Sequence, residues 1–208
     1  MDRPSHQHQG LRFGPLSNRT LHVCVDMQRM FAAGGPWETP WLEQVRPVVL
    51  RLCSAHPDRA ILTRFIPPYR AEQAPGTWRR FYERWPQVTR QQLDPACLDL
   101  LPELAALAPP AVIVDKATYS PFSGSALDDI LAARVTEAVI FSGTETDVCV
   151  LAAALDAVDR GLRVIIVTDA ICSSKDDTHD ALMRLYQRRF GCQIETATCD
   201  EVLASWPG

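Results

Sequence analysis

The sequence has no long apolar run and no excess of basic residues. None of its 208 residues lies in an apolar stretch of the roughly 20 residues that a bilayer-spanning helix needs. The formal net charge of −4 gives no electrostatic reason to expect a nucleic acid or a membrane surface as partner. The N-terminal MDRPSHQHQG has no apolar segment of the kind found in secretory signals. These features predict a cytoplasmic protein that binds neither nucleic acid nor membranes.

Paired cysteines and grouped histidines are also missing. The seven cysteines are odd in number, and none forms a Cys-x-x-Cys pair, which argues against a disulfide framework and a structural zinc site. The five histidines are isolated or lie near the N-terminus, without the spacing of metal ligands. We therefore expect no metal and no other cofactor. Each cysteine is by default a small buried side chain, and a special one must be argued from its surroundings.

The sequence does contain short apolar runs that alternate with helical patterns. The hydrophobic share of 47% and the charged share of 22% are typical of a soluble globular protein. Strands are predicted at Leu21–Asp26, Ala60–Phe65, Ala111–Lys116, Glu137–Gly143, Arg163–Ala170 and Cys192–Ala197. Helices are predicted at Trp41–His56, Ser125–Arg134, Asp147–Gly161, Asp176–Gly191 and Asp200–Trp206. Continuous Val and Ile runs indicate strands covered on both faces, so we predict an α/β fold with a parallel sheet between helix layers.

Residues 1–19 lack this periodicity. We expect them to form an N-terminal arm that is mobile or packs on a neighbour, and residues 20–208 to form one domain.

Three chemically active residues follow three different predicted strands. Asp26 ends the first strand, Lys116 ends the third, and Cys149 comes shortly after the fourth. In open parallel sheets, ligands bind beyond the carboxyl ends of the strands, where the strand order reverses. We therefore expect an acid, an amine and a thiol to meet at that edge of the sheet.

The expected position of Cys149 suits a nucleophile. In the first turn of a helix, free N–H groups and the helix dipole favour an anion, and both they and the nearby Lys116 should lower the pKa of the thiol. Asp26 can take the thiol proton and pass it to a leaving amine. Simpler interpretations remain open: Cys149 as a buried helix residue, Lys116 as a solvated strand-end lysine and Asp26 as a helix cap.

Three segments carry a resemblance to a known family. VCVDMQRMF has an acid followed by Met-Gln and an aromatic residue. DKATYSPFSGSAL has a lysine followed by a Ser-x-Phe segment. SGTETDVCVLAAALDAVDRGLRVIIVTDA contains G-x-x-T-x-x-C before a helix and a strand. Together, and in this order, they resemble the motifs of the isochorismatase-like cysteine hydrolases, a group that includes nicotinamidases and N-carbamoylsarcosine amidohydrolases.

The resemblance implies a three-layer α/β/α fold whose six parallel strands have the order 3-2-1-4-5-6. It also implies a triad of Asp26, Lys116 and Cys149, and an oxyanion hole made by the backbone N–H groups of Glu145 and Cys149. The peptide bond between Thr144 and Glu145 would be cis. Relatives are often dimers or tetramers, so we expect a homo-oligomer.

The sequence also departs from part of the group. Nicotinamidases bind a metal through an Asp-x-His and a further His after the second strand, whereas RFIPPYRAEQAP has neither residue type there. The resemblance thus implies a metal-independent cysteine hydrolase that cleaves a C–N bond of a small amide or ureide through an acyl-enzyme. The alternatives are an isochorismatase-type vinyl ether hydrolase, a catalytically silent binding protein of the same fold, and a redox-sensing thiol.

The stretch between the second and third strands is long and rich in proline, arginine and aromatic residues, which is typical of a binding loop. Arg79 and Arg80 within it are candidates for reading a substrate carboxylate, although a basic helix face exposed to water is the better explanation for them. The candidate substrate-binding residues are aromatic: Phe31, Phe65, Trp78, Tyr82, Tyr119 and Phe122.

Overall fold

The six predicted strands form one parallel sheet in the computed structural model, which describes residues 10–207. The strands are β1 (Thr20–Val25), β2 (Ala60–Phe65), β3 (Val112–Lys116), β4 (Ala138–Thr144), β5 (Arg163–Cys172) and β6 (Ile194–Ala197). All neighbouring pairs are parallel, and the order is β3-β2-β1-β4-β5-β6. The predicted strand order is therefore confirmed, and the order in which strands are added to the sheet reverses between β1 and β4.

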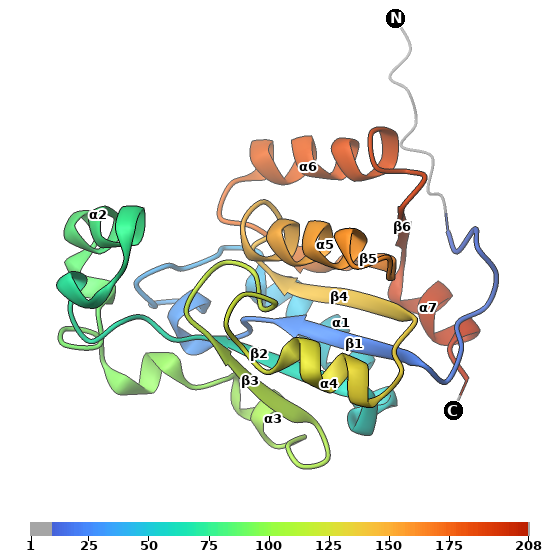
Figure 1. Ribbon diagram of the computed structural model, residues 1–208, viewed down its shortest axis with the longest axis horizontal. Helices are drawn as coiled ribbons and strands as arrows, with labels where there is room; N and C mark the ends of the chain where they lie inside the picture. Colours follow the sequence, from blue (N-terminus) through green and yellow to red (C-terminus); the bar gives the residue numbers. More distant parts are fainter. Residues whose placement is uncertain (1–9, 208) are drawn as a thin grey trace, which may run out of the picture.

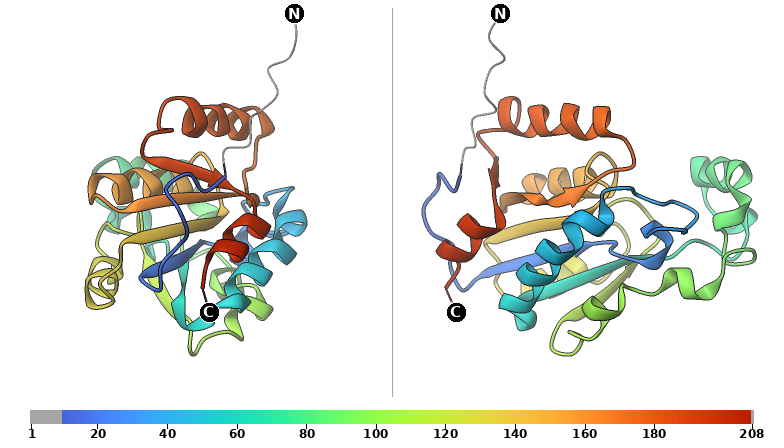
Figure 2. Two further views of the ribbon diagram at one scale, coloured as in Figure 1. Left: turned by 90° about the vertical axis from the view of Figure 1, so that its right-hand side faces the viewer. Right: turned by 180° about the vertical axis from the view of Figure 1, so that it is seen from behind.

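Helices cover both faces of the sheet. The helices of residues 10–207 are α1 (Leu42–Ala55), α2 (Gly76–Arg84), α3 (Pro102–Ala105), α4 (Leu127–Ala133), α5 (Cys149–Asp159), α6 (Asp176–Arg188) and α7 (Cys199–Ser205), and all but α2 lie on the sheet. Short 3-10 turns lie at η1 (Arg29–Phe31), η2 (Pro57–Arg59), η3 (Ala71–Gln73), η4 (Pro86–Val88) and η5 (Pro95–Leu98). Figures 1 and 2 show α4, α5 and α6 on one side of the sheet and α1, α3 and α7 on the other. The structure is thus a three-layer α/β/α fold, as predicted.

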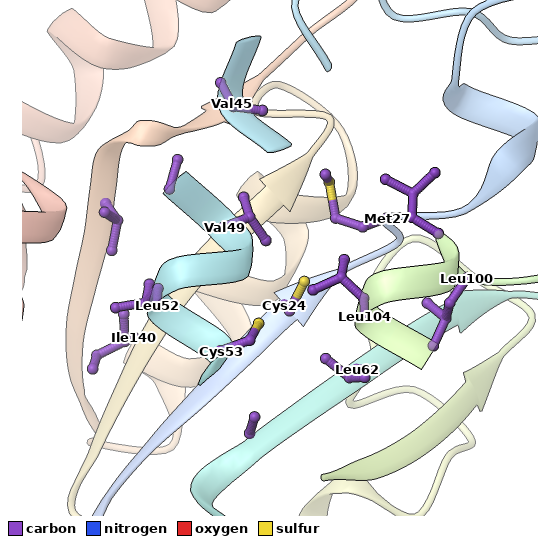
Figure 3. Packing of buried hydrophobic residues seen from close by; sticks show 14 of the residues in the cluster. Cys24, Met27, Val45, Val49, Leu52, Cys53, Leu62, Leu100, Leu104 and Ile140 are labelled. Atoms are coloured by element: carbon purple, nitrogen blue, oxygen red, sulfur yellow. The ribbon is translucent and has the colours of Figure 1, made fainter. Parts of the chain in front are cut away.

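The packing of α1 shows why the strands read as continuous apolar runs. Its buried face points at the sheet and at residues that follow β1 and precede β3 (Figure 3). A second buried cluster lies on the other face, under α4, α5 and α6. Because each central strand is covered twice, its inward and outward side chains are both apolar. The residues of the first cluster that Figure 3 labels are Cys24, Met27, Val45, Val49, Leu52, Cys53, Leu62, Leu100, Leu104 and Ile140.

The described part of the predicted N-terminal arm packs on its own chain. The Phe13 N–H donates to Glu195 Oε1 over 3.0 Å, and Arg163 Nη2 donates to the Gly14 carbonyl over 2.7 Å. Leu16 is buried. Residues 10–19 therefore form a fixed strap over β5 and β6 rather than a mobile arm, while residues 1–9 lie outside the described residues. The division at residue 19 stays a prediction.

The long segment between β2 and β3 contains η3, α2, η4, η5 and α3. The part that carries α2 lies beyond the carboxyl ends of β1 and β4, apart from the sheet at the left of Figure 1, whereas α3 packs in the cluster with α1. The sequence did not predict α2, because this stretch combines prolines with arginines and aromatic residues. Within residues 10–207, none of the helices combines the length and apolar character needed to cross a membrane.

Candidate active site

Asp26 directly follows β1 and is fully buried. Its backbone has a φ of 50°, a conformation that few residues other than glycine adopt. Thr63, on the neighbouring strand β2, holds this residue at two atoms. The Thr63 hydroxyl donates to Asp26 Oδ1 over 2.6 Å and accepts from the Asp26 N–H over 3.1 Å. One oxygen of the carboxylate is therefore fixed, and the other faces the remaining site residues.

Lys116, the last residue of β3, joins the acid to the thiol. Its Nζ lies 2.6 Å from Asp26 Oδ2 and 3.4 Å from Cys149 Sγ, and it donates to the Thr118 carbonyl over 3.0 Å. The ammonium also lies 5.0 Å from the centre of the Phe65 ring, at a distance typical of a cation–π contact. The structure thus brings Asp26, Lys116 and Cys149 together from three separate segments.

Close contact between β1 and β4 sets the position of the third residue. Gly143 pairs with Val25, and a Cβ at Gly143 would lie 2.1 Å from the Val25 carbonyl oxygen. The φ of Gly143 is 103°, which only glycine adopts readily. The following peptide bond, between Thr144 and Glu145, is cis, as the family resemblance implies. This turn leads into α5, whose first residue is Cys149.

The N-terminus of α5 differs in detail from the sequence-based expectation. Val148 is the N-cap residue and makes no side-chain cap bond, while the Thr146 hydroxyl pairs with His179 Nδ1 at 2.9 Å. Within residues 10–207, the N–H groups of Glu145 and Cys149 donate to no backbone carbonyl. Two free donors therefore lie in the turn that carries the thiol.

Burial raises the pKa of the Cys149 thiol well above its ordinary value, so the expected lowering is wrong. Lys116 acts in the opposite direction, and Asp26 adds to the rise through its charge and a hydrogen bond. The helix N-terminus and one ammonium do not offset removal from water next to a carboxylate. Before substrate binds, the sulfur therefore keeps its proton near neutral pH, hydrogen-bonded to Asp26.

The pKa of Lys116 is raised. Burial alone would lower it, but the charges of Asp26 and Cys149 and their hydrogen bonds outweigh burial. The amine is therefore protonated at neutral pH, and its charge is balanced by the Asp26 carboxylate. A buried pair of this kind is tolerated because each charge has a partner within hydrogen-bonding distance.

A cavity of about 580 Å³ opens beside the thiol. Its volume lies within the range of small-molecule sites in proteins. Six of its lining residues are aromatic, and Cys149 is at the wall together with the turn before α5. The lining residues are Phe31, Gly35, Pro36, Trp37, Glu38, Phe65, Phe81, Trp85, Tyr119, Glu145, Val148, Cys149 and Ser174.

The predicted aromatic residues fall into three groups. Phe31, Phe65 and Tyr119 line the cavity. Trp78 and Tyr82 lie behind this wall: the Trp78 ring is 4.6 Å from the ring of Tyr119 and 6.1 Å from that of Tyr82, which is buried.

Phe122 does not line the cavity, contrary to expectation. It packs in the cluster beneath α4 and α5, with the Arg160 guanidinium 4.2 Å from its ring centre. Its place a few residues after Lys116 does not lead it to the site, because the chain turns towards α4.

Sequence reasoning missed several residues around the site. Trp37, Phe81 and Trp85 line the cavity, and Thr63 holds Asp26. A signal existed for Trp37, since it follows a Gly-Gly-Pro turn soon after the first strand, at the ligand edge of the sheet. Thr63 gave none, because a threonine inside a strand is ordinary.

The residues after β2 do not suit the metal site of a nicotinamidase. The stretch from 64 to 75 offers neither histidine nor aspartate. Among residues 10–207, no group of three or more His, Cys, Asp and Glu side chains is placed to hold a metal ion.

Comparison with known proteins relates this site to one family. Residues 20–198 match the model of the isochorismatase domain. The chain is 31% identical over 88 residues to maleamate amidohydrolase of Pseudomonas putida, a match covering 41% of each chain. It is 25% identical over 209 residues to ureidoacrylate amidohydrolase of Methylorubrum extorquens, covering 91% of this chain and 84% of the relative. The match to the first of these relatives thus spans less than half of its length.

A solved structure extends the likeness to the whole chain. The crystal structure of a cysteine hydrolase from Pseudomonas syringae pv. phaseolicola 1448A superposes with a TM-score of 0.78 at 26% identity, covering 99% of this chain and 98% of the other. The strand order, the three motifs and the match over residues 20–198 agree. The chain belongs to the isochorismatase domain family.

Proposed function

We propose that this protein is a cysteine hydrolase that cleaves the C–N bond of a small amide or ureide, without a metal ion and through an acyl-enzyme on Cys149. The observation that carries the proposal is the position of Lys116 Nζ, 2.6 Å from an Asp26 oxygen and 3.4 Å from the Cys149 sulfur, beside a cavity. The names of two relatives, both amidohydrolases, support the same reaction class.

The acylation step begins from a neutral thiol. As Cys149 Sγ attacks the amide carbon, its proton passes to Asp26 and a sulfur–carbon bond forms. The C–N bond then breaks, and the leaving amine takes the proton from Asp26. Lys116 remains protonated throughout. The buried site therefore keeps one positive and one negative charge, and only the location of the negative charge changes from carboxylate to sulfur or to the substrate oxygen.

Deacylation uses the same groups in reverse. Asp26 takes a proton from a water molecule while the oxygen of that water adds to the thioester carbonyl carbon. The carbon–sulfur bond breaks, and the sulfur recovers its proton from Asp26, which releases a carboxylic acid and restores the starting state. The hydrogen bonds from Thr63 keep the carboxylate directed at the same place in both half-reactions.

The oxygen of each tetrahedral intermediate needs donors. The N–H groups of Glu145 and Cys149 are the candidates, because both lie in the turn that carries the sulfur and neither donates to a backbone carbonyl within residues 10–207. Backbone donors fixed before the reaction stabilise developing negative charge without having to reorganise.

Replacement of Cys149 tests the proposal. Cys149→Ala should lower kcat/KM for every hydrolysed amide by at least about 1,000-fold, since the nucleophile is lost. Cys192→Ala removes an exposed cysteine and should leave the rate unchanged. Circular dichroism should show both variants folded. Undiminished amide hydrolysis by folded Cys149→Ala would refute the mechanism. Retained vinyl ether cleavage by that variant would indicate the isochorismatase-type reaction, and no turnover of any amide by the wild type would indicate a binding protein.

We further propose that the protein is a cytoplasmic homo-oligomer, a dimer or a tetramer. The exposed aromatic residues Tyr69 and Trp85 in the segment between β2 and β3 support a surface for self-association. Analytical ultracentrifugation measures the mass of the protein in solution. A monomer at micromolar concentration would contradict the proposed oligomer. Cell fractionation checks the location.

A further inference from the structure

The cavity beside Cys149 has acidic but no basic lining residues. Glu145 and the exposed Glu38 are among its lining residues, which include no lysine, arginine or histidine. Both carboxylates are held in place by backbone donors. Glu38 Oε2 accepts from the Gly34 N–H over 2.8 Å, and Glu145 Oε1 accepts from the Ser174 N–H over 2.9 Å.

The nearest positive charge is already neutralised. Lys116 pairs with Asp26 at 2.6 Å and is buried behind the thiol, so it offers no separate site to an anion. Arg84 lies with its guanidinium 5.2 Å from the Trp85 ring centre, but it is exposed and does not line the cavity. Arg79, a sequence candidate for reading a carboxylate, pairs with Glu83 at 3.0 Å.

The remainder of the wall is mostly aromatic. The Trp37 ring lies 6.0 Å from Phe31, 6.0 Å from Phe65 and 5.8 Å from Phe81, measured between ring centres. Such a surface gains free energy when it covers an apolar group and attracts cations through the ring faces. It offers little to replace the hydration of a carboxylate.

We propose that the substrate of this site is a neutral or cationic carboxamide or ureide with a bulky apolar group, and that the site selects against substrates carrying a second, ionised carboxylate. This inference rests on the proposed function. The apolar group occupies the aromatic wall, the reacting carbonyl lies at Cys149, and Glu38 and Glu145 repel an anionic substituent. Without a basic partner, the carboxylate of such a substrate loses hydration and gains no ion pair.

Three amides that differ in one substituent provide the test: 4-methylbenzamide, 4-(aminomethyl)benzamide and 4-carbamoylbenzoate. At neutral pH these are neutral, cationic and anionic. We expect kcat/KM for the first two to exceed that for the anion by at least about tenfold. We expect acetamide to be poorer than 4-methylbenzamide, because it covers none of the aromatic wall. An anion hydrolysed as well as the neutral amide would overturn the inference.

Charge variants assign any discrimination to the cavity. Glu38→Lys should raise kcat/KM for the anionic amide relative to the neutral one by at least about tenfold, and Glu38→Gln should give a smaller change in the same direction. Glu72→Lys is the matched control, since Glu72 is an exposed residue of η3 that does not line the cavity. An equal effect of Glu72→Lys would mean that general surface charge is responsible, which contradicts the inference.

A binding measurement separates this inference from the proposed function. Trp37 and Trp85 line the cavity, so quenching of tryptophan fluorescence in the Cys149→Ala variant reports binding of the three amides without turnover. Tighter binding of the neutral and cationic amides supports the inference even if none is hydrolysed, in which case the proposed reaction fails alone. Tighter binding of 4-carbamoylbenzoate would refute the inference even if Cys149 is the nucleophile.

Discussion

At the scale of single residues, the chemistry depends on how three buried groups share protons and charge. Burial and Asp26 keep the Cys149 thiol protonated, while Lys116 favours the thiolate. The site therefore works best if proton transfer to Asp26 accompanies attack on the substrate, because a standing thiolate would leave two negative groups to share one ammonium. The charges of the buried site then remain balanced in each state of the reaction.

This balance predicts how the thiol reacts with iodoacetamide as pH changes. Because the pKa of Cys149 is raised, its alkylation rate in the wild type should still be rising above about pH 9. Asp26→Asn removes one cause of the raised thiol pKa, so alkylation of Cys149 in this variant should speed up at a lower pH than in the wild type. Peptide mass spectrometry measures the alkylated fraction of Cys149 over time, and the exposed Cys192 serves as internal reference. A wild-type plateau near pH 6–7 would contradict the account.

Thr63 is a positioning residue for Asp26, since its hydroxyl bonds both the carboxylate and the N–H of that residue. Thr63→Val should lower kcat by about 10–100-fold with little change in KM, as expected for loss of a hydrogen bond to a charged group. Thr63→Ser should restore most of the rate. A Thr63→Val variant with raised KM and unchanged kcat would show that Thr63 shapes the binding site instead.

At the scale of secondary-structure elements, the sequence predicted strands and helices well where the pattern is continuous. Short apolar stretches marked all six strands, and the motifs located the turn before α5. The helix α2 was not predicted, because it is short and lies between Pro75 and Pro86 in a stretch rich in arginine and aromatic residues. The beginning of α5 also differed: the structure starts it at Cys149, two residues after Asp147.

The contact between β1 and β4 provides a prediction at this scale. Gly143→Ala places a Cβ 2.1 Å from the Val25 carbonyl oxygen in a backbone with a φ of 103°. It should lower the free energy of unfolding by about 3 kcal/mol or more. Gly161→Ala is the control, because its Cβ meets nothing within 4 Å and only its φ of 74° is unfavourable. Its loss should be about 1 kcal/mol.

Urea denaturation measures both glycine variants. Equal losses for Gly143→Ala and Gly161→Ala would show that the β1–β4 approach is less tight than described, and the placement of Asp26 beside the α5 turn would lose its support.

At the scale of the whole molecule, stability should depend on pH through one buried histidine. His22 in β1 is completely buried, with Nε2 2.7 Å from the Ser142 hydroxyl, and burial lowers its pKa from 6.5 to about 3. Between about pH 3 and pH 6.5, His22 therefore binds a proton in the unfolded chain but not in the folded chain. The resulting stability is present above about pH 6.5 and is lost as pH falls towards 3.

From this His22 alone, the free energy of unfolding should fall by about 1.4 kcal/mol between pH 7.5 and pH 5.5. Urea titrations at both pH values measure the change. His22→Gln should lose that part of the pH dependence even if it is less stable overall. A wild-type protein that is equally stable at both values, or a variant with an undiminished fall, would contradict the neutral buried histidine.

The fold and the meeting of Asp26 with Lys116 and Cys149 were predictable, because the three motifs place these residues after three different strands, whereas Thr63 beside Asp26 was not. The cavity wall was only partly predictable. Phe122 turned away from the site with the chain that follows Lys116, while Trp37 and Trp85 reached it from two separate loops. Such contacts depend on loop paths, which periodic patterns do not encode. The predicted lowering of the thiol pKa was wrong for a related reason, because the pKa depends on how deeply the sulfur is buried.

The most direct test of the central claim is mass spectrometry of the protein quenched during hydrolysis of 4-methylbenzamide. We predict a mass increase equal to the acyl group on the peptide containing Cys149, formed and lost at rates that match turnover. Hydrolysis at an undiminished rate with no such adduct, or with the adduct on another residue, would contradict the account.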